Sequence, residues 1–423
     1  MLSTIPQANR TMEGRSPIDR ACFAAIFSSL GPLAFYAPKG MWIPILLFLL
    51  VRLKILASLT FRDIRHIAGC TVPYLMLPGY AVLSASWALV PENAVTAGAK
   101  LLGCLIAAIA VVVVVDRLSD DEKRSILIWS SVGLAAACIA VWLDLATAGA
   151  ISALFRERPY TSLFHSPGAV IAACAVLPVV VGLWRLAGSR PAIVTAVICV
   201  ATVFVLQNEA AKLAAVLALL VYSAVRWRGA LFWPAILLPL AIGLIFPAFF
   251  VNGVSDSTLC NLYHSKPSAA HRLVIYEFVS RRIFEKPLLG WGMDASRSMP
   301  GGKTQAFIRD CEIENRKGTV HKLGAFLPLH PHNAALQVWL ELGAAGVALF
   351  LGLLGALIVR CRREIASRNG QALLAGLLAS IFVIYNIGFG LWQSWLIFAL
   401  IIVSAIVRAL PLSGRPADDG FPD

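Results

Sequence analysis

The sequence predicts an all-α protein that crosses a membrane many times. Of its 423 residues, 59% are hydrophobic and only 14% are charged, which lies outside the usual range of soluble globular proteins. The apolar residues gather in about twelve long stretches, and a helix needs roughly 20 such residues to cross a bilayer. The alternation of apolar and polar residues that a membrane barrel requires is absent, so a helical bundle is the better interpretation.

The predicted spans divide the chain into one membrane domain with a single large insertion. We expect spanning helices one to nine over residues 1–251, and a large loop with an amphipathic helix over 252–333. Helices ten to twelve follow over 334–410, and a disordered tail rich in Gly, Pro and Asp covers 411–423. The twelve spans lie near residues 22–38, 41–59, 70–90, 97–115, 125–148, 168–186, 191–207, 211–226, 229–251, 334–359, 371–389 and 391–409.

The net charge of +13 indicates how the chain is oriented. Arginine and lysine concentrate in alternate short loops, whereas the loops at 91–96 and 386–391 contain neither. By the positive-inside rule the basic loops and both termini are cytoplasmic, and loop 252–333 lies outside. Most of the basic residues then serve topology, and the others are candidates for contact with an anionic lipid or a phosphate. The polar segment Met1–Arg20 lacks the pattern of a cleavable signal, so we expect the first helix to remain as an anchor.

The large loop contains a helical pattern of its own. After Pro267 and Ser268, residues recur at helical spacing to about Glu285, with Arg272 at one end of the apolar stripe. We expect this helix to lie on the membrane surface and to end before a turn at residues 287–292. The segment 294–329 has mixed charge and little periodicity, and we expect an adaptable loop there.

Two cysteines, Cys260 and Cys311, also fall in this loop. In an oxidising compartment they could form a disulfide. Two free or buried thiols are the alternative.

The segment His330-Pro331-His332-Asn333 stands where the large loop re-enters the membrane. At a helix start the positive end of the dipole disfavours an imidazolium. A neutral imidazole at His332, facing the outer aqueous boundary, suits a general base. We expect His330 either to substitute for it or to cap the helix.

Three polar residues follow on one side of the tenth helix, because Asn333, Gln337 and Glu341 are four residues apart. A carboxylate inside a spanning helix is costly, so we expect Glu341 to face the bundle interior with a partner. A structural hydrogen-bond stripe is the alternative to a role in ligand binding.

Basic residues on the outer side need another explanation than topology. Arg156 and Arg158 lie in the outer loop 155–166, and Arg272 leads the loop helix. Binding an anion is the natural reason, because a guanidinium binds a phosphate with two hydrogen bonds; solvation is the alternative. Lys212 begins the eighth helix at the same boundary and either contacts the ligand or reaches the lipid headgroups. The sequence shows no Asp/Glu cluster at metal-binding spacing, so we expect no metal and no cofactor, with arginine neutralising a phosphate leaving group.

These residues resemble the signature of the O-antigen ligase and polymerase superfamily. The pair His332-Asn333, followed by Glu341-Leu342-Gly343, is similar to that family's His-Asn pair and Glu-x-Gly motif. Arg272-x-x-x-Tyr276 with the turn 287–292 resembles its arginine-led loop helix and its Pro-x-x-Gly-x-Gly turn.

The resemblance covers roughly residues 155–345, since the segment from Arg158 to Pro167 is similar to the family's earlier outer loop. One departure is that the family usually has a Ser-Arg pair opening the helix after the seventh. Here that helix opens with Lys212 and no arginine.

The resemblance implies a metal-independent, GT-C-like glycosyltransferase in the bacterial inner membrane, with its active site on the periplasmic face. Such an enzyme transfers O-antigen from undecaprenyl pyrophosphate to a sugar hydroxyl of lipid A-core, with inversion. It implies His332 as the base and Arg272 and Arg158 as pyrophosphate ligands. Further candidates for substrate contact are Arg156, Lys212, His330, Asn333 and Gln337.

Other functions remain open. An O-antigen polymerase or an O-linked protein oligosaccharyltransferase would use the same donor. A transporter or flippase would show inverted repeats and helices broken near the middle of the membrane. We expect membrane lipids as partners and no nucleic acid.

Overall fold

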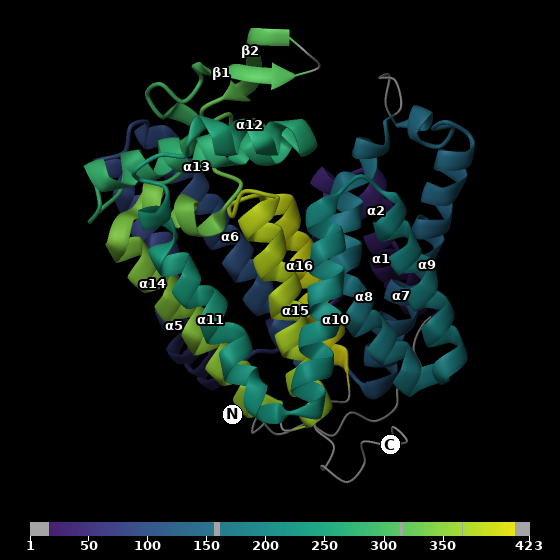
Figure 1. The fold of residues 1–423 in the computed structure, drawn as a ribbon. Helices are drawn as coiled ribbons and strands as arrows, with labels where there is room; N and C mark the ends of the chain where they lie inside the picture. Colours follow the sequence, from purple (N-terminus) through teal and green to yellow (C-terminus); the bar gives the residue numbers. More distant parts are fainter. Residues whose placement is uncertain (1–16, 156–160, 314–315, 366, 411–423) are drawn as a thin grey trace.

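The computed structural model describes residues 17–155, 161–313, 316–365 and 367–410. Most of this chain forms a bundle of roughly parallel and antiparallel helices, and a smaller layer lies across one end of it (Figure 1). The helices of the bundle are α1 (Pro17–Ser28), α2 (Leu30–Tyr36), α3 (Trp42–Val51), α4 (Leu53–Ala57), α5 (Phe61–Leu83), α6 (Pro91–Asp116), α7 (Asp120–Ala146), α8 (Ser166–Ala187), α9 (Ser189–Val205), α10 (Glu209–Trp227), α11 (Phe232–Ile245), α14 (Ala334–Glu364), α15 (Arg368–Ile387) and α16 (Ser394–Ala409).

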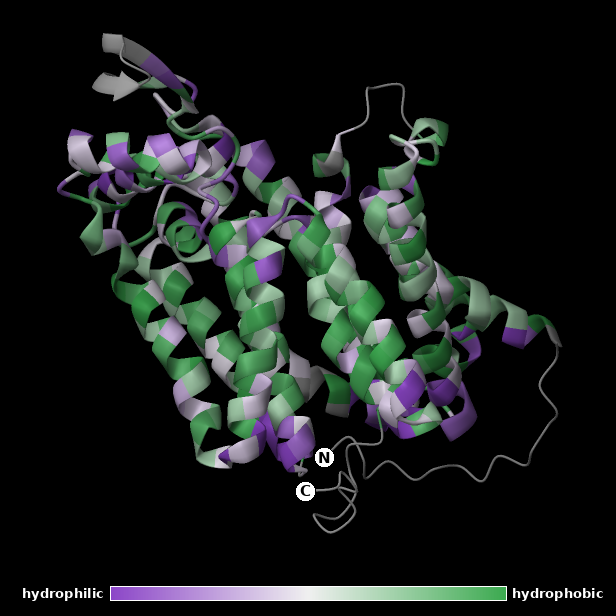
Figure 2. Ribbon diagram, turned by 45° about the vertical axis from the view of Figure 1, so that its right-hand side comes forward, coloured by the Kyte–Doolittle hydropathy of each residue, from purple (hydrophilic) through white to green (hydrophobic). Residues whose placement is uncertain are grey.

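The bundle has the lengths and composition of a multi-pass membrane protein. Within the described residues, eight helical segments are long and apolar enough to cross a membrane, and three apolar helices are shorter. Hydrophobic residues fill the middle of the bundle and hydrophilic residues gather at its two ends (Figure 2). All of the predicted stretches contain helix, but the count of about twelve spans and the GT-C-like classification stay predictions.

Small residues allow the central helices to approach closely. The span Leu163–Ala187 contains α8. In its most apolar stretch of 18 residues, 72% of the residues are buried, which is more than in any other span of the described chain. Gly376 of α15 illustrates the contact with α10, since a Cβ there would lie 2.7 Å from the Ala218 carbonyl oxygen. Close packing of this kind stabilises helix pairs in lipid, where apolar surface alone gives little preference for protein over solvent.

Ion pairs join the helices at the charged end of the bundle, opposite the layer. Arg408 binds Asp116 through two hydrogen bonds of 2.6 and 2.8 Å and also contacts Glu364. Arg52 bridges Asp19 and Glu122 at 3.4 and 3.0 Å. These groups belong to the loops that the charge pattern assigns to the cytoplasm.

The layer at the other end consists of α12 (Asp256–Ser265), α13 (Pro267–Glu285) and a hairpin of β1 (Gln305–Ile313) and β2 (Arg316–Ala325). The helix predicted to follow Pro267 and Ser268 and to end near Glu285 is present as α13, which begins at Pro267 and ends at Glu285. In Figure 1, α12 and α13 lie across the ends of the bundle helices rather than parallel to them.

The hairpin corrects the prediction of an irregular segment over residues 294–329. Ala306 and Ile308 are buried in a cluster with Leu259 and Val274, whereas Phe307 between them is 53% exposed. This alternation is the signal of a strand with one buried face. The charged residues that follow at 309, 310 and 312 obscure it in the sequence.

The predicted disulfide is tested only in part. Cys260 of α12 is disulfide-bonded, and α12 packs against β1, which carries Cys311. The side chain of Cys311 lies outside the described residues, so the pairing of these two cysteines stays a prediction.

The layer is attached to the bundle at an interruption of α14. Gly343 leaves the helical conformation there, with φ 63° and ψ −166°. The turn after α13 fills the gap: the amide groups of Ala344 and Ala345 donate to the carbonyl oxygens of Pro287 and Leu288 at 2.8 and 3.1 Å. In the opposite direction, the amide groups of Trp291 and Gly292 donate to the carbonyl oxygens of Leu340 and Glu341 at 2.9 and 2.8 Å.

Only glycine fits at the centre of this exchange. A Cβ on Gly343 would lie 2.5 Å from the Gly290 nitrogen, and a Cβ on Gly290 would lie 2.6 Å from the carbonyl carbon of Glu341. Both glycines also have positive φ angles, which cost an L-residue about 1–2 kcal/mol.

Substitution of Gly343 by alanine should therefore detach the turn. We expect Gly343→Ala to lower the midpoint of thermal unfolding in detergent by about 5 °C or more, because backbone strain and the clash with Gly290 add. Gly352→Ala is the matched control, since Gly352 lies on the same helix with open space around it. The control should be neutral or stabilising, and equal midpoints for the two variants would contradict this account of the turn.

Candidate functional site

His332 lies between the layer and the bundle, one residue before the cap of α14. Its backbone is left-handed, with φ 54°, and its Nδ1 lies 2.7 Å from the carbonyl oxygen of Gly388 in the α15–α16 connection. A carbonyl oxygen only accepts hydrogen bonds, so Nδ1 carries the hydrogen. In the neutral ring the lone pair then belongs to Nε2, which is the arrangement that a general base requires.

His330 does not cap the helix, contrary to one of the two predicted roles. Asn333 is the cap, and its Oδ1 accepts from the Leu336 amide at 2.9 Å. His330 is buried beside His332 instead, with the ring centroids 4.3 Å apart. Its Nδ1 accepts a hydrogen bond of 3.2 Å from the His332 amide, so His330 supports the conformation of the loop that presents His332.

The neutral form of both imidazoles is favoured. The sequence predicted a neutral ring for His332 alone, and the main cause is burial rather than the expected helix dipole. Burial lowers the pKa of His330 to about 3, and the charges of His332 and Arg297 act in the same direction. Burial also lowers the pKa of His332, and Arg272 and His271 add to this effect. The hydrogen bond to Gly388 acts in the opposite direction on the pKa of His332.

Arg272 is brought near His332 by α13. Its positive charge lowers the pKa of both His332 and Tyr276, and such effects require proximity. Among the described residues Arg272 has neither a hydrogen bond nor an ion pair. The other two arginines of α13 are neutralised locally, since Arg281 pairs with Glu277 at 2.7 Å and Arg282 with Glu285 at 3.0 Å. Arg272 is therefore the arginine of this helix that presents an uncompensated charge.

Lys212 lies in the first turn of α10, which reaches the same region. Its Nζ pairs with the exposed Glu209 at 3.0 Å. The helix packs beside Gly388, because a Cβ on that glycine would lie 3.6 Å from the Ala210 Cβ. Lys212 thus lies on the helix that packs beside Gly388, the residue to which His332 is hydrogen-bonded. Its contact with substrate stays a prediction.

The predicted polar stripe on α14 is a structural hydrogen-bond network. Glu341 is fully buried, and Oε1 accepts from Ser296 at 2.5 Å and from Gln337 at 3.1 Å. Its Oε2 accepts from the Asp294 amide at 2.9 Å and from the Trp392 indole at 2.7 Å. The expectation that Glu341 faces the interior with a partner is thus confirmed, with four donors in place of one.

Gln337 and Asn333 are engaged in the same way. The carbonyl group of Gln337 accepts from the Leu391 amide at 2.8 Å, so both polar groups of this side chain bind protein. Asn333 caps the helix and donates to the Asn386 carbonyl oxygen at 3.4 Å. These contacts position the loops around His332, and a direct contact with substrate stays a prediction.

Sequence reasoning missed the residues from other segments that contact His332, His330 and Glu341. Gly388, Trp392 and Gln393 come from the α15–α16 connection, and Asp294 and Ser296 from the segment after α13. The connection was noted only for its lack of basic residues. Its glycines at 388 and 390 and the Trp-Gln pair at 392–393 were the sequence features that could have marked it as part of the site.

Arg156 and Arg158 lie outside the described residues. The described flanks of their loop are held together by Asp144, which accepts from the Ile151 amide at 2.7 Å and lies 3.3 Å from His165. Within the described chain, no group of three or more His, Cys, Asp or Glu side chains is arranged to hold a metal ion.

Comparison with known proteins shows what this segment of the chain is similar to. Residues 194–351 match the family described as O-antigen ligase. Over this segment the chain is similar to O-antigen ligases. The matched residues include Lys212, Arg272, His332 and Glu341, whereas Arg156 and Arg158 precede them.

Several rickettsial proteins with the name "Putative polysaccharide ligase" are similar to this chain. The relative from Rickettsia conorii is 32% identical over 196 residues, which cover 45% of this chain and 44% of the relative. The relative from Rickettsia typhi is 33% identical over 185 residues, covering 43% and 42%. The relative from Rickettsia bellii is 36% identical over 177 residues, covering 42% and 38%. This chain therefore spans less than half the length of these relatives.

The depressed pKa of His330 predicts how stability depends on pH. Between its ordinary value of 6.5 and about 3, the unfolded chain binds a proton that the folded chain does not, so stability falls as the pH falls. From pH 7 to pH 5 this group alone accounts for at most about 2 kcal/mol. We expect His330→Gln to reduce the loss of stability over that range, measured as unfolding midpoints in detergent.

The exposed His264 offers the control for this experiment. His264→Gln should retain the pH dependence of the unsubstituted protein. Comparison of the variants removes the contribution of other groups, such as Asp294, whose pKa is raised by burial. An unchanged acid profile in His330→Gln would show that this imidazole is not buried as described.

Proposed function

We propose that this protein transfers O-antigen polysaccharide from undecaprenyl pyrophosphate to a sugar hydroxyl of lipid A-core, at the periplasmic face of the bacterial inner membrane. One observation carries the proposal. His332 binds Gly388 through Nδ1, which leaves the Nε2 lone pair available, and the uncompensated charge of Arg272 acts on this imidazole. The match of this segment to the O-antigen ligase family supports the reaction class.

In the proposed reaction, His332 Nε2 removes the proton from the acceptor hydroxyl. The acceptor oxygen attacks the anomeric carbon of the donor sugar, and the bond between that carbon and the pyrophosphate oxygen breaks. Attack from the side opposite the leaving group inverts the anomeric centre. Negative charge develops on the pyrophosphate, where Arg272 stabilises it without a metal ion. Arg158, Arg156 and Lys212 complete the set of proposed cations.

Donor binding also makes His332 a better base. In the structure the charge of Arg272 lowers the pKa of His332. A bound pyrophosphate neutralises that charge, so proton transfer to Nε2 becomes more favourable once the donor is present. This coupling disfavours a charged imidazole in the absence of donor.

The acceptor distinguishes the alternatives, which are an O-antigen polymerase and an O-linked protein oligosaccharyltransferase. The decisive assay uses the purified chain in liposomes with undecaprenyl-pyrophosphate glycan. Lipid A-core, a second molecule of donor and a pilin-like protein are offered in separate reactions. We expect transfer to lipid A-core alone; elongation of the donor or labelling of the protein would replace the ligase by the corresponding alternative.

Two substitutions test the roles of the site residues. We expect His332→Ala to reduce transfer by about 10²–10⁴-fold, which is the usual contribution of a general base, while the donor still binds. Arg272→Lys should lose about tenfold or more, because an ammonium keeps the charge but cannot bind a phosphate with two parallel hydrogen bonds.

Arg281→Lys is the matched control on α13, since Arg281 pairs with Glu277. It should retain full transfer. Wild-type transfer in His332→Ala would remove the base assignment, and equal activity of Arg272→Lys and the control would reduce Arg272 to a solvated surface residue.

A further inference from the structure

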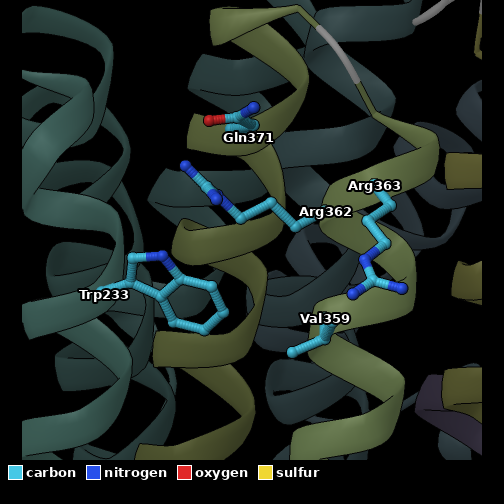
Figure 3. A pocket seen from close by; sticks show the side chains of 5 residues that line it. All are labelled: Trp233, Val359, Arg362, Arg363 and Gln371. Atoms are coloured by element: carbon cyan, nitrogen blue, oxygen red, sulfur yellow. The ribbon is translucent and has the colours of Figure 1, made fainter.

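A second basic site lies at the opposite end of α14 from His332. There α11, α14 and α15 surround a cavity of about 340 Å³ lined by Trp233, Val359, Arg362, Arg363 and Gln371. Figure 3 shows Arg362 extending from α14 between Trp233 and Gln371, whereas the guanidinium group of Arg363 points to the other side, near Val359. The helix that carries both arginines thus joins this cavity to the candidate active site.

Arg362 is held in place by aromatic rings. Its guanidinium carbon lies 5.2 Å from the ring centroids of both Phe232 and Trp233. Contact with an aromatic face stabilises a cation and fixes its orientation. Its Nε is nevertheless buried without a hydrogen-bond acceptor among the described residues. A buried donor of this kind requires an acceptor from elsewhere.

The charges of Arg362 and Arg363 are not neutralised within the described chain. This distinguishes them from Arg360 and Arg408 at the same end of the bundle. Arg360 pairs with Glu364 at 3.2 Å, and Arg408 binds both Asp116 and Glu364. Glu364 and Asp116 thus pair with Arg360 and Arg408, and the cavity lining contains no carboxylate. The two guanidinium groups of Arg362 and Arg363 remain for an anion.

The surface beside the cavity is apolar and faces outward. In the most apolar window of the span Gly229–Phe249, which contains α11, only 11% of the residues are buried. Leu237, Leu238 and Ile245 are 56%, 65% and 55% exposed along this helix. An anion that enters between the arginines can thus extend hydrocarbon chains along α11.

We propose that this cavity binds the headgroup of an anionic glycerophospholipid of the leaflet opposite the candidate active site. The phosphate lies between Arg362 and Arg363 and accepts from the buried Nε of Arg362, while the acyl chains follow the exposed face of α11. A site of this kind, basic and between spanning helices, combines charge attraction with apolar contact. The proposal does not depend on the reaction assigned to His332.

Native mass spectrometry of the full chain in detergent tests the site. The protein is titrated with phosphatidylglycerol, with phosphatidylcholine as the zwitterionic comparison and inorganic phosphate as the soluble one. We expect one tightly held phosphatidylglycerol that phosphatidylcholine does not replace. Displacement of the lipid by millimolar phosphate, or equal retention of both lipids, would overturn the proposal.

Substitutions test whether the bound lipid occupies the cavity. An arginine close to a charged lipid surface is worth about a fivefold factor in affinity, so Arg362→Gln with Arg363→Gln should weaken phosphatidylglycerol binding by about tenfold or more. Arg124→Gln with Arg190→Gln is the matched control, since both residues are exposed at the ends of other helices and the same net charge is removed.

Single substitutions keep the test meaningful if the double variant folds poorly. Arg362→Lys retains the charge but loses the stacked guanidinium, and Trp233→Leu removes one ring from beneath it. Both should weaken retention of phosphatidylglycerol without making it equal to that of phosphatidylcholine. Unchanged lipid retention in these two variants, or an equal loss in the matched control, would show that the bound lipid occupies another surface.

Discussion

The arrangement depends on the exchange of backbone hydrogen bonds between the turn after α13 and the interrupted part of α14. A helix that breaks inside an apolar bundle leaves amide and carbonyl groups without partners, and lipid provides none. Residues 287–292 supply donors and acceptors to both sides of Gly343. Tyr80 contributes a further donor from α5, with its hydroxyl 3.2 Å from the Leu342 carbonyl oxygen. The interruption is therefore stable only while the layer is attached.

This attachment holds α13, which carries Arg272, against α14. The turn is continuous with α13, and the Trp291 indole donates back to the Arg282 carbonyl oxygen at 2.8 Å. Glu341 lies at the same level and receives donors from the segment after the turn and from the α15–α16 connection. One buried carboxylate thus links the segments that surround the two histidines. Such a fully satisfied polar group favours a single arrangement of its neighbours.

The two ends of α14 differ in how their positive charge is compensated. At the layer end, Arg272 acts on a neutral imidazole and has no carboxylate partner among the described residues. At the other end, Arg408 and Arg360 share Glu364, and the remaining charge of Arg362 rests on aromatic rings. An uncompensated guanidinium at a membrane boundary is costly unless an anion is available. Both ends are therefore suited to binding an anion.

The sequence by itself determined the helical membrane architecture, the helix Pro267–Glu285 and the residue types at the site, because hydropathy and helical spacing are local properties of the chain. It also indicated a neutral His332 and a buried, partnered Glu341. Only the tertiary structure decided that Asn333 rather than His330 caps α14, that Gly388 fixes the tautomer of His332, and that Gln337 binds Glu341 and Leu391. The tautomer of His332 and the contact of Gln337 with Leu391 depend on segments more than fifty residues apart, 332 with 388 and 337 with 391. Periodicity carries no information on which distant backbone group will satisfy a buried side chain, so that part of the site appears only once the helices are packed.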